Sequence, residues 1–186
     1  GYKALQKNTN GNNNIALGFQ TLIENQGNYN VAIGSNSLRY NTTGNDNFAL
    51  GTDALYNNVS ASSNLAIGRR SLYNNTVGEY NIANGVNALN YNVVGNNNVA
   101  IGFSSLNKNN TSDNVGIGYE TLKVNVNGEK NVAIGSQSLL MNTSSNNVGI
   151  GFKSLFNNTT GEENVAIGSL SLLQNKTGKY NVAIGY

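Results

Sequence analysis

One short phrase, anchored on a glycine, repeats along the entire chain. Successive anchor glycines are 16 or 17 residues apart over eleven steps. A unit this short cannot bury its own apolar face, so it must stack on its neighbours in a quasi-one-dimensional array. We therefore expect residues 1–186 to form a single repeat array. The anchor glycines are Gly1, Gly18, Gly34, Gly51, Gly68, Gly85, Gly102, Gly118, Gly135, Gly151, Gly168 and Gly185.

The three residues before each anchor glycine alternate large, small and large, as in Val132-Ala133-Ile134. The only departure at the large positions is Asn84. This period of two, together with frequent β-branched residues, indicates a short β-strand in every repeat. We expect the large residues to face the core and the column of Ala and Gly to face away from it.

The residues after each anchor glycine complete the unit. Leucine always lies four residues after the anchor, and a turn such as Asn41-Thr42-Thr43-Gly44 follows. About 17 residues are too few for two strands joined by a crossover helix. The sequence therefore predicts an all-β fold, a parallel β-solenoid of eleven rungs of 16–17 residues. A strand spacing of about 4.8 Å would make a rod roughly 50 Å long.

Two asparagine positions never vary along the chain. Identical amides on neighbouring rungs can bond to one another, so both columns are predicted to form structural asparagine ladders. The first column, four residues before each anchor, is Asn14, Asn30, Asn47, Asn64, Asn81, Asn98, Asn114, Asn131, Asn147, Asn164 and Asn181. The second column, seven residues after each anchor, is Asn8, Asn25, Asn41, Asn58, Asn75, Asn92, Asn109, Asn125, Asn142, Asn158 and Asn175.

The core of such a coil is thin. Three large apolar side chains in each rung must offset the ordering of about 17 residues, which costs roughly 1–2 kcal/mol for each residue. The asparagine ladders would supply part of the difference. Packing against copies of the same chain would supply more, so a homo-oligomer or an end-to-end filament is expected.

The phrase Asn-Val-Ala-Ile-Gly-x-x-Ser-Leu, found at 131–139 and 164–172, resembles the head repeats of YadA-like trimeric autotransporter adhesins. The longer period, with its Leu-x-x-Asn-Thr-Thr-Gly tail, is similar to repeats of bacterial surface fibres and of phage or virus tail fibres. The resemblance covers all eleven units, but the head repeat is shorter and the extra residues here follow the leucine. It implies a left-handed β-roll, trimerisation, secretion and adhesion to a host-surface or carbohydrate receptor.

The amino-acid composition excludes most catalytic mechanisms. The chain has no His and no Cys, so the usual nucleophile–base pairs and zinc sites are missing. The only acidic doublet, Glu162-Glu163, is interpreted as a solvated turn. We therefore expect no enzyme activity, no metal and no cofactor. The sparse, nearly balanced charge argues against nucleic acid as a partner, and no apolar run is long enough for membrane insertion of this segment.

Aromatic residues and glycosylation sequons leave alternatives open. An aromatic stripe formed by residues such as Tyr40, Tyr56, Tyr73 and Tyr91 could stack sugars, but covering the core edge or a subunit seam is the favoured interpretation. The sequons have turn chemistry as their simpler explanation. They lie at Asn41, Asn58, Asn74, Asn109, Asn110, Asn142, Asn157, Asn158 and Asn175.

The resulting functional hypothesis is a structural and adhesive repeat module of an extracellular fibre, adhesin or tail fibre, on a cell or virion surface. It would act as a stiff spacer with receptor contacts along its sides. A self-assembling filament subunit is the alternative, and an ice-binding solenoid ranks lower because no threonine column is regular enough. The chain begins and ends on the repeat boundary without an initiator Met, which we interpret as a segment of a longer fibre protein.

Overall fold

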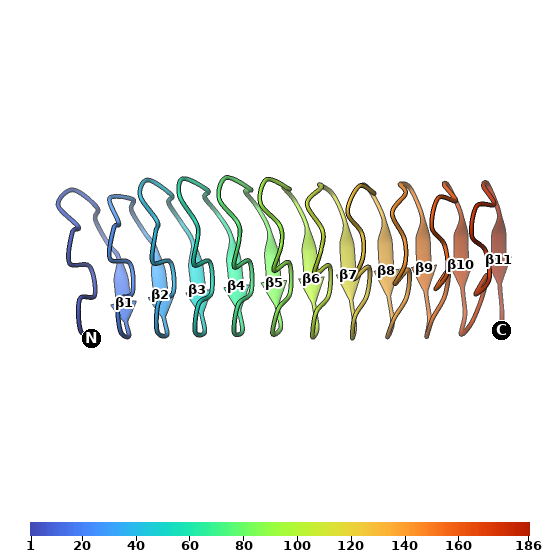
Figure 1. Cartoon of the computed structure of the whole chain (residues 1–186), viewed down its shortest axis with the longest axis horizontal. Helices are drawn as coiled ribbons and strands as arrows, with labels where there is room; N and C mark the ends of the chain where they lie inside the picture. The colour runs from blue at the N-terminus through green and yellow to red at the C-terminus, as the bar shows by residue number, and fades with distance from the viewer.

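The chain forms a straight β-solenoid with no helix, described by a computed structural model that covers residues 1–186. Each coil contributes one three-residue strand, and the coils stack side by side with the two termini at opposite ends (Figure 1). The strands are β1 Ile15–Leu17, β2 Val31–Ile33, β3 Phe48–Leu50, β4 Leu65–Ile67, β5 Ile82–Asn84, β6 Val99–Ile101, β7 Val115–Ile117, β8 Val132–Ile134, β9 Val148–Ile150, β10 Val165–Ile167 and β11 Val182–Ile184. The predicted all-β parallel solenoid is confirmed.

All eleven strands belong to one parallel sheet in sequence order, from β1 to β11. Equivalent residues pair across every step, so that Val132 lies beside Val148 and Ile134 beside Ile150. The 16-residue rungs keep this register because the missing residue falls outside the strand. The sequence phrase is therefore also the structural repeat, and every residue type forms a column along the rod.

Hydrogen bonds connect the coils around their whole circumference. Only 20 of the 110 backbone hydrogen bonds lie within the strands. Many of the others run from one rung to the next in the turn segments, for example from Leu38 N to Ala54 O at 2.9 Å and from Thr42 N to Val59 O at 2.8 Å. A coil held to its neighbours on every side can bend little without breaking many bonds, so the rod is stiff.

The predicted orientation of the strand residues is wrong. The alanine column points inward, and Ala32, Ala66 and Ala100 are fully buried, whereas the large flanking residues point outward. Leucines of the segment after the anchor are fully buried against these alanines, as predicted for that column. Asn84 therefore lies on the outer surface and not in the core, which explains why a polar residue is tolerated there.

The interior is too narrow for large side chains on both walls. At Gly116, which replaces alanine in β7, an added Cβ would lie 3.2 Å from Leu106 Cγ and 2.7 Å from Ser105 Oγ. The Ser105 hydroxyl occupies that space and donates to Gly116 O at 2.8 Å. Because alanine already fills the gap between the two walls, a valine or isoleucine facing inward would overpack it.

Every complete coil contains three non-glycine residues with a left-handed backbone. They lie five residues before, two residues after and four residues after the anchor glycine. The last is the core leucine, with φ between 47° and 52° in all eleven copies. This conformation is costly for residues other than Gly, Asn and Asp. Full burial of the leucine side chain offsets that cost at the core position, whereas the other two positions are mostly at the surface.

A stabilising substitution follows from this backbone. Lys130 has φ 57°, is exposed and makes no side-chain hydrogen bond, so Lys130→Asn is expected to stabilise the fold by about 0.5–1 kcal/mol. Thermal denaturation followed by circular dichroism measures the change. Lys108→Asn is the matched control, because Lys108 is also exposed but lacks the positive φ. Equal melting shifts for the two variants would contradict the explanation.

Candidate functional site

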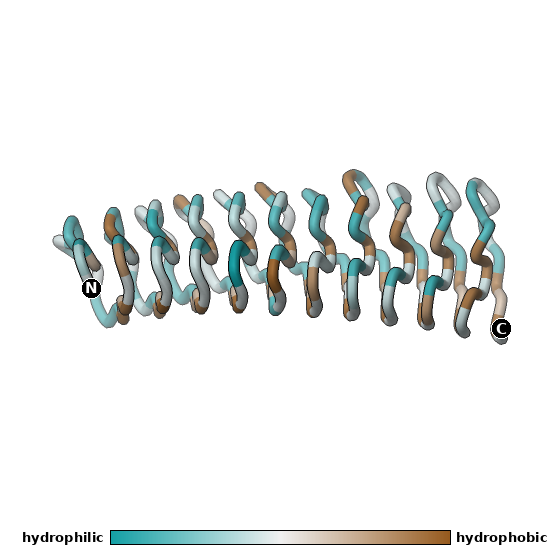
Figure 2. The backbone as a smooth tube through the Cα atoms, turned by 60° about the horizontal axis from the view of Figure 1, so that its bottom comes forward, coloured by the Kyte–Doolittle hydropathy of each residue, from teal (hydrophilic) through white to brown (hydrophobic).

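The outer face of the sheet is lined by two columns of large aliphatic or aromatic side chains, three residues and one residue before each anchor glycine. We call these two columns the outer apolar face. It runs over all eleven strands, and its only polar member is Asn84. No second layer covers it, and even in the central strands Ile101 is 37% and Ile134 is 36% exposed. The apolar segments recur at the same place in every coil (Figure 2).

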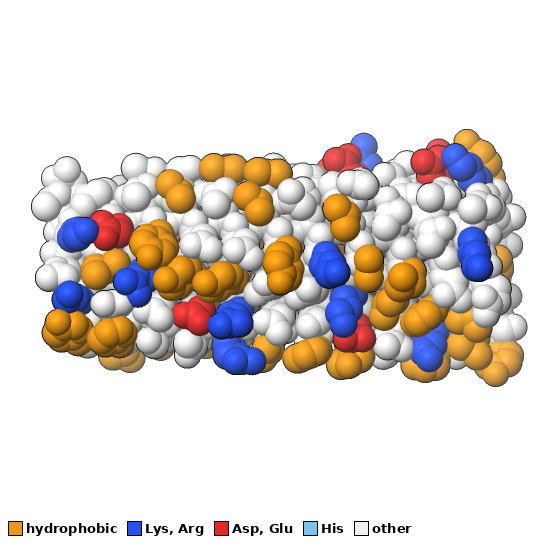
Figure 3. Space-filling view, viewed as in Figure 1, with side chains coloured by type: hydrophobic (Ala, Val, Ile, Leu, Met, Phe, Trp, Pro, Cys, Tyr) orange, Lys and Arg blue, Asp and Glu red, His pale blue; other side chains and the backbone are white.

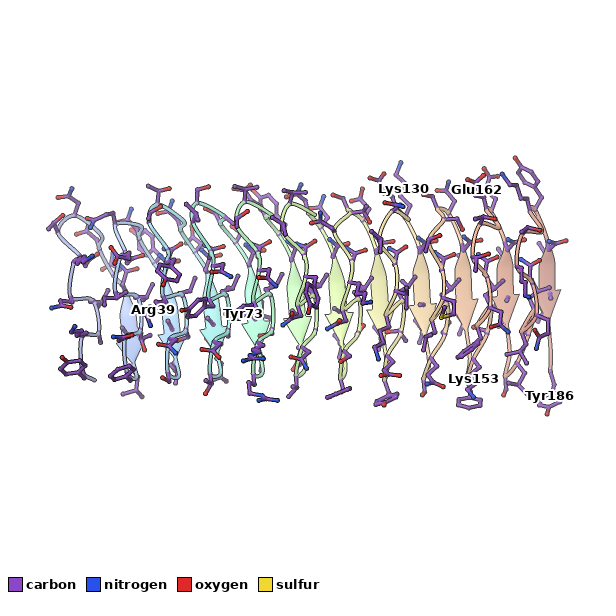
Figure 4. The ribbon with its side chains drawn as sticks, in the orientation of Figure 1. Arg39, Tyr73, Lys130, Lys153, Glu162 and Tyr186 are labelled. Atoms are coloured by element: carbon purple, nitrogen blue, oxygen red, sulfur yellow. The ribbon has the colours of Figure 1, made fainter.

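Aromatic residues directly after the anchor glycines extend this face at the corner of the coil. Tyr2 stacks on Phe19 with ring centroids 5.6 Å apart, and Phe103 stacks on Tyr119 at the same distance. All four rings are exposed. Lys153 Nζ lies 5.1 Å from the ring centroid of Phe152, near the same edge of the rod as Tyr186 (Figure 4). These rings do not cover the leucine core, because that core is closed by the sheet itself.

The first asparagine column forms a continuous ladder at the corner where the strand begins. Asn98 is typical: its Oδ1 accepts from the backbone N–H of Asn114 at 3.0 Å. Its Nδ2 donates to Asn81 Oδ1 at 3.1 Å and to the turn carbonyl of Thr111 at 2.7 Å. The Asn98 amide thus connects its own rung to both neighbours, and in Asn30, Asn114 and Asn147 only the backbone N–H bonds to the previous rung. The predicted interaction between neighbouring rungs is confirmed for this column.

The second asparagine column holds the turn and also bonds along the rod. Asn58 Nδ2 donates to Asn41 Oδ1 at 2.7 Å and to Ala61 O, three residues further along, at 3.0 Å. One amide therefore closes its own turn and binds the previous rung. Because Asp lacks the donor and Ser is too short to reach both acceptors, only asparagine satisfies the two contacts together.

This second ladder is interrupted at two of the 16-residue rungs. Asn109 Nδ2 donates only to Thr111 O, at 2.8 Å, and the buried Oδ1 of Asn92 is left without a partner. At the other rung Asn142 Nδ2 donates to Ser144 O, and Asn125 Oδ1 accepts from Gly128 N at 3.1 Å instead. In the shortened turns the amide-to-amide bond between rungs is therefore lost, and the hydroxyl groups of Thr111 and Ser144 donate to Gly128 O and Gly161 O of the next rung.

A second aromatic cluster lies on the side of the coil opposite the sheet. Tyr40 contacts Tyr56 edge to face at 5.1 Å, and Tyr56 stacks on Tyr73 at 5.0 Å. Arg39 lies over the rings of Tyr40 and Tyr56, at 5.4 and 5.9 Å from their centroids. Interaction with the Tyr40 hydroxyl, followed by burial, raises the pKa of the Tyr56 phenol above its ordinary value. Figure 4 labels Arg39 and Tyr73, and Figure 3, in the same orientation, shows apolar side chains gathered on this face.

The sequons fall into two structural groups. In the first group the asparagine belongs to the second column, and in Asn41, Asn58, Asn109, Asn142 and Asn158 the side chain is buried and its Nδ2 donates inside the coil. Asn175 also belongs to this column and its Nδ2 donates to Asn158 Oδ1 and Gly178 O, but its side chain is only half-buried. The second group, Asn74, Asn110 and Asn157, has exposed or half-buried side chains outside the column. Folding therefore withdraws the amide nitrogens of the first group from solvent.

The acidic doublet lies in a surface turn, as predicted from its sequence. Glu162 Oε2 accepts from Lys179 Nζ at 2.7 Å, one rung along, and this hydrogen bond raises the pKa of Lys179. Both side chains are about half exposed. The structure has no group of three or more acidic, His or Cys side chains arranged to hold a metal ion.

Comparison with known proteins gives no relative for this chain. No protein family, curated protein or solved structure matches it. No helix in the structure is of the length and apolarity needed to cross a bilayer.

Proposed function

We propose that the chain is a structural and adhesive repeat module of an extracellular fibre, adhesin or tail fibre, and that it self-associates through the outer apolar face. The observation that carries the proposal is the outer apolar face itself, which runs over all eleven strands without a covering layer. A stiff coil that carries such a face is suited to be a spacer whose sides bind other surfaces. The resemblance of the repeat phrase to adhesin head repeats supports the same conclusion.

The size of the outer apolar face argues for burial. Two columns along eleven rungs cover a strip roughly 50 Å long and 7 Å wide, or about 350 Å² in projection. Exposed apolar patches of a few hundred Å² or more mark interaction sites in soluble proteins. The strip carries no charge and Asn84 is its only polar side chain, so desolvation of the strip costs little.

The narrow shape of the strip favours three copies over two. In a flat pair, one partner covers the strip and the flanking aromatic residues remain in solvent. In a closed ring of three, the strip lies at the axis and each copy contacts two neighbours. The exposed aromatic rings at the corner, such as Phe103 and Tyr119, would then cover the seams between copies.

Charge placed on the outer apolar face is expected to abolish self-association. The parent chain should sediment as a trimer at micromolar concentration, and the double variant Ile101→Glu with Ile134→Glu as a monomer. Both side chains point away from the core, so the variant keeps its fold, and burying two carboxylates in a seam is too costly for assembly. Analytical ultracentrifugation measures the mass.

The matched control carries the same two charges on turn residues. Val77 and Val94 are each 49% exposed and lie away from the outer apolar face, so Val77→Glu with Val94→Glu should leave the trimer intact. A parent chain that is monomeric and cooperatively folded would refute the proposal. The same conclusion would follow if both double variants lost assembly equally.

A further inference from the structure

The rod has one surface hollow of substantial size, with a volume of about 700 Å³. It lies on the side opposite the outer apolar face, between the residues six and eight places after the anchor glycines. We call it the tyrosine groove. Its walls are Glu24, Tyr40, Thr42, Asn57, Val59, Asn74, Thr76, Tyr91 and Val93.

A change of residue size along one column forms the tyrosine groove. Six places after the anchors of four successive rungs, the side chains are Tyr40, Asn57, Asn74 and Tyr91. Two short amides between two long phenols leave a depression that both rings enclose. Five rungs contribute to the walls, so the groove extends over four rung spacings, or roughly 19 Å.

Amides and hydroxyls of the groove are held in fixed directions. Asn57 Nδ2 donates to Asn74 Oδ1 at 3.3 Å, and Asn74 Nδ2 donates to Asn90 O at 3.0 Å. The Thr42 hydroxyl donates to Val59 O at 2.7 Å. These bonds fix the side chains, so that Asn57 Oδ1 and the Thr42 oxygen are acceptors held in the wall, and each amide keeps one free N–H. A ligand with many hydroxyl donors would find them already oriented.

Tyr91 offers the freest aromatic surface in the groove. It is 56% exposed and makes no ring stacking or cation contact, whereas Tyr40 is partly covered by Arg39. A free ring at one end and a second ring at the other are suited to the apolar faces of sugar rings. The valines between them supply further apolar contact.

The backbone N–H groups of the groove are already bonded between rungs and offer no donor to a peptide strand. Asn57 N donates to Tyr73 O, Asn74 N to Asn90 O and Tyr91 N to Asn107 O, all between rungs. An extended peptide therefore cannot add to this surface as a further strand. Charge is also nearly absent, because the only ionised side chain, Glu24, is paired with Lys7 at 2.8 Å. A polyanion would find no cluster of cations in the walls.

From this combination we propose that the tyrosine groove binds a neutral linear oligosaccharide, with a sugar ring stacked on Tyr91 and hydroxyl groups bonded to the Asn57 and Thr42 oxygens. The rungs repeat at a fixed spacing along the rod, and the sugar rings of a linear glycan likewise repeat along its length. The site is complete within one chain and lies away from the outer apolar face. It therefore gives the proposed adhesive function a ligand class without depending on self-association.

Isothermal titration calorimetry of the full chain with cellohexaose, maltohexaose and chitohexaose tests the proposal. At least one of these is expected to bind, and Tyr91→Ala should weaken that binding roughly tenfold, the upper range for loss of an aromatic contact. Asn74→Tyr fills the hollow instead of emptying it and should also abolish binding. The two variants have opposite effects on packing, so a shared loss points to the groove and not to misfolding.

Tyr80→Asn is the matched control, because Tyr80 is 61% exposed, lies outside the groove and has a backbone that suits asparagine. It should bind as the parent does, and so should the monomeric variant Ile101→Glu with Ile134→Glu. Failure of all three hexasaccharides to bind would overturn the proposal. So would an equal loss in Tyr80→Asn, or tighter binding of a heparin hexasaccharide than of any neutral one.

Discussion

Replacing Gly135 with alanine is expected to lower the free energy of unfolding by about 2–6 kcal/mol, through backbone strain and overpacking together. Gly135 has φ 117°, a conformation that other residues rarely adopt. An added Cβ would lie 2.7 Å from Gly151 O and 2.8 Å from Gly151 C, atoms of the next rung. These are backbone atoms and cannot rotate away, so relief requires that β8 and β9 separate.

The neighbouring Ser136→Ala is the control for this substitution. Ser136 is adjacent to the anchor, has an ordinary backbone conformation and makes no side-chain hydrogen bond. Chemical denaturation of both variants gives the two free energies. A loss below about 1 kcal/mol for Gly135→Ala, which is typical of an average substitution, would show that the rungs can slide apart cheaply. Glycine at the anchor positions would then not be required by the close approach of neighbouring rungs.

The repeat length, the strand position and the parallel register were predictable because each follows from periodicity alone. A fixed step places equivalent residues beside one another whatever the shape of the coil. The direction of the strand side chains was not predictable in the same way. Large-small-large alternation separates two faces but does not say which one is inside, and Val132-Ala133-Ile134 reads identically in either orientation.

The deciding quantity was the distance between the two walls of the coil. Leu106 comes so close to the sheet that Gly116 could hardly accommodate a methyl group. That distance depends on the left-handed backbone of the leucine, for which the sequence has no signal. One indication was available: Asn84 occupies a large position without any compensating change nearby, which an inward-facing column would not allow.

The tyrosine groove was missed for a related reason. In sequence, Tyr40 and Tyr91 were grouped with Tyr56 and Tyr73 as one aromatic stripe. In the structure Tyr40 and Tyr91 line the groove and Tyr56 and Tyr73 do not, although Tyr40 also contacts Tyr56. The sixth position alone has two asparagines between two tyrosines, and a size change of that kind in an otherwise regular column was the usable signal.

Changing Asn98 and Asn114 to aspartate is expected to lower the free energy of unfolding by roughly 6–10 kcal/mol, more than Gly135→Ala, if each buried carboxylate costs about 3–5 kcal/mol. The Nδ2 atom of Asn98 donates to Asn81 Oδ1 and Thr111 O, and that of Asn114 donates to Gly128 O at 3.0 Å. Aspartate replaces each donor with a second acceptor, so oxygen faces oxygen at every contact. The two new charges would also lie on neighbouring rungs, about 5 Å apart.

The same pair changed to alanine isolates the hydrogen bonds from the charge. Asn98→Ala with Asn114→Ala removes the amides and leaves the backbone N–H groups of Asn114 and Asn131, which donate to the two lost Oδ1 atoms, unpaired, for an expected loss of about 2–6 kcal/mol. Asn110→Asp with Asn127→Asp is the control for charge. Both side chains are exposed, and the bonds that Asn110 Oδ1 accepts from Val93 N and Val94 N survive the change. This control should melt within error of the parent.

The pH dependence of its stability distinguishes the aspartate variant from a variant that has only lost packing. Burial among acceptors should raise the pKa of the new carboxyl groups above its value in the unfolded chain. Their protonated form is then favoured by folding, so the deficit relative to the parent should shrink at acidic pH and grow as the pH rises through the raised pKa. Melting at about pH 3 and about pH 7 measures the difference. If the deficit did not change with pH, or if the alanine variant melted like the parent, the buried ladder would not be what holds neighbouring rungs together at this corner.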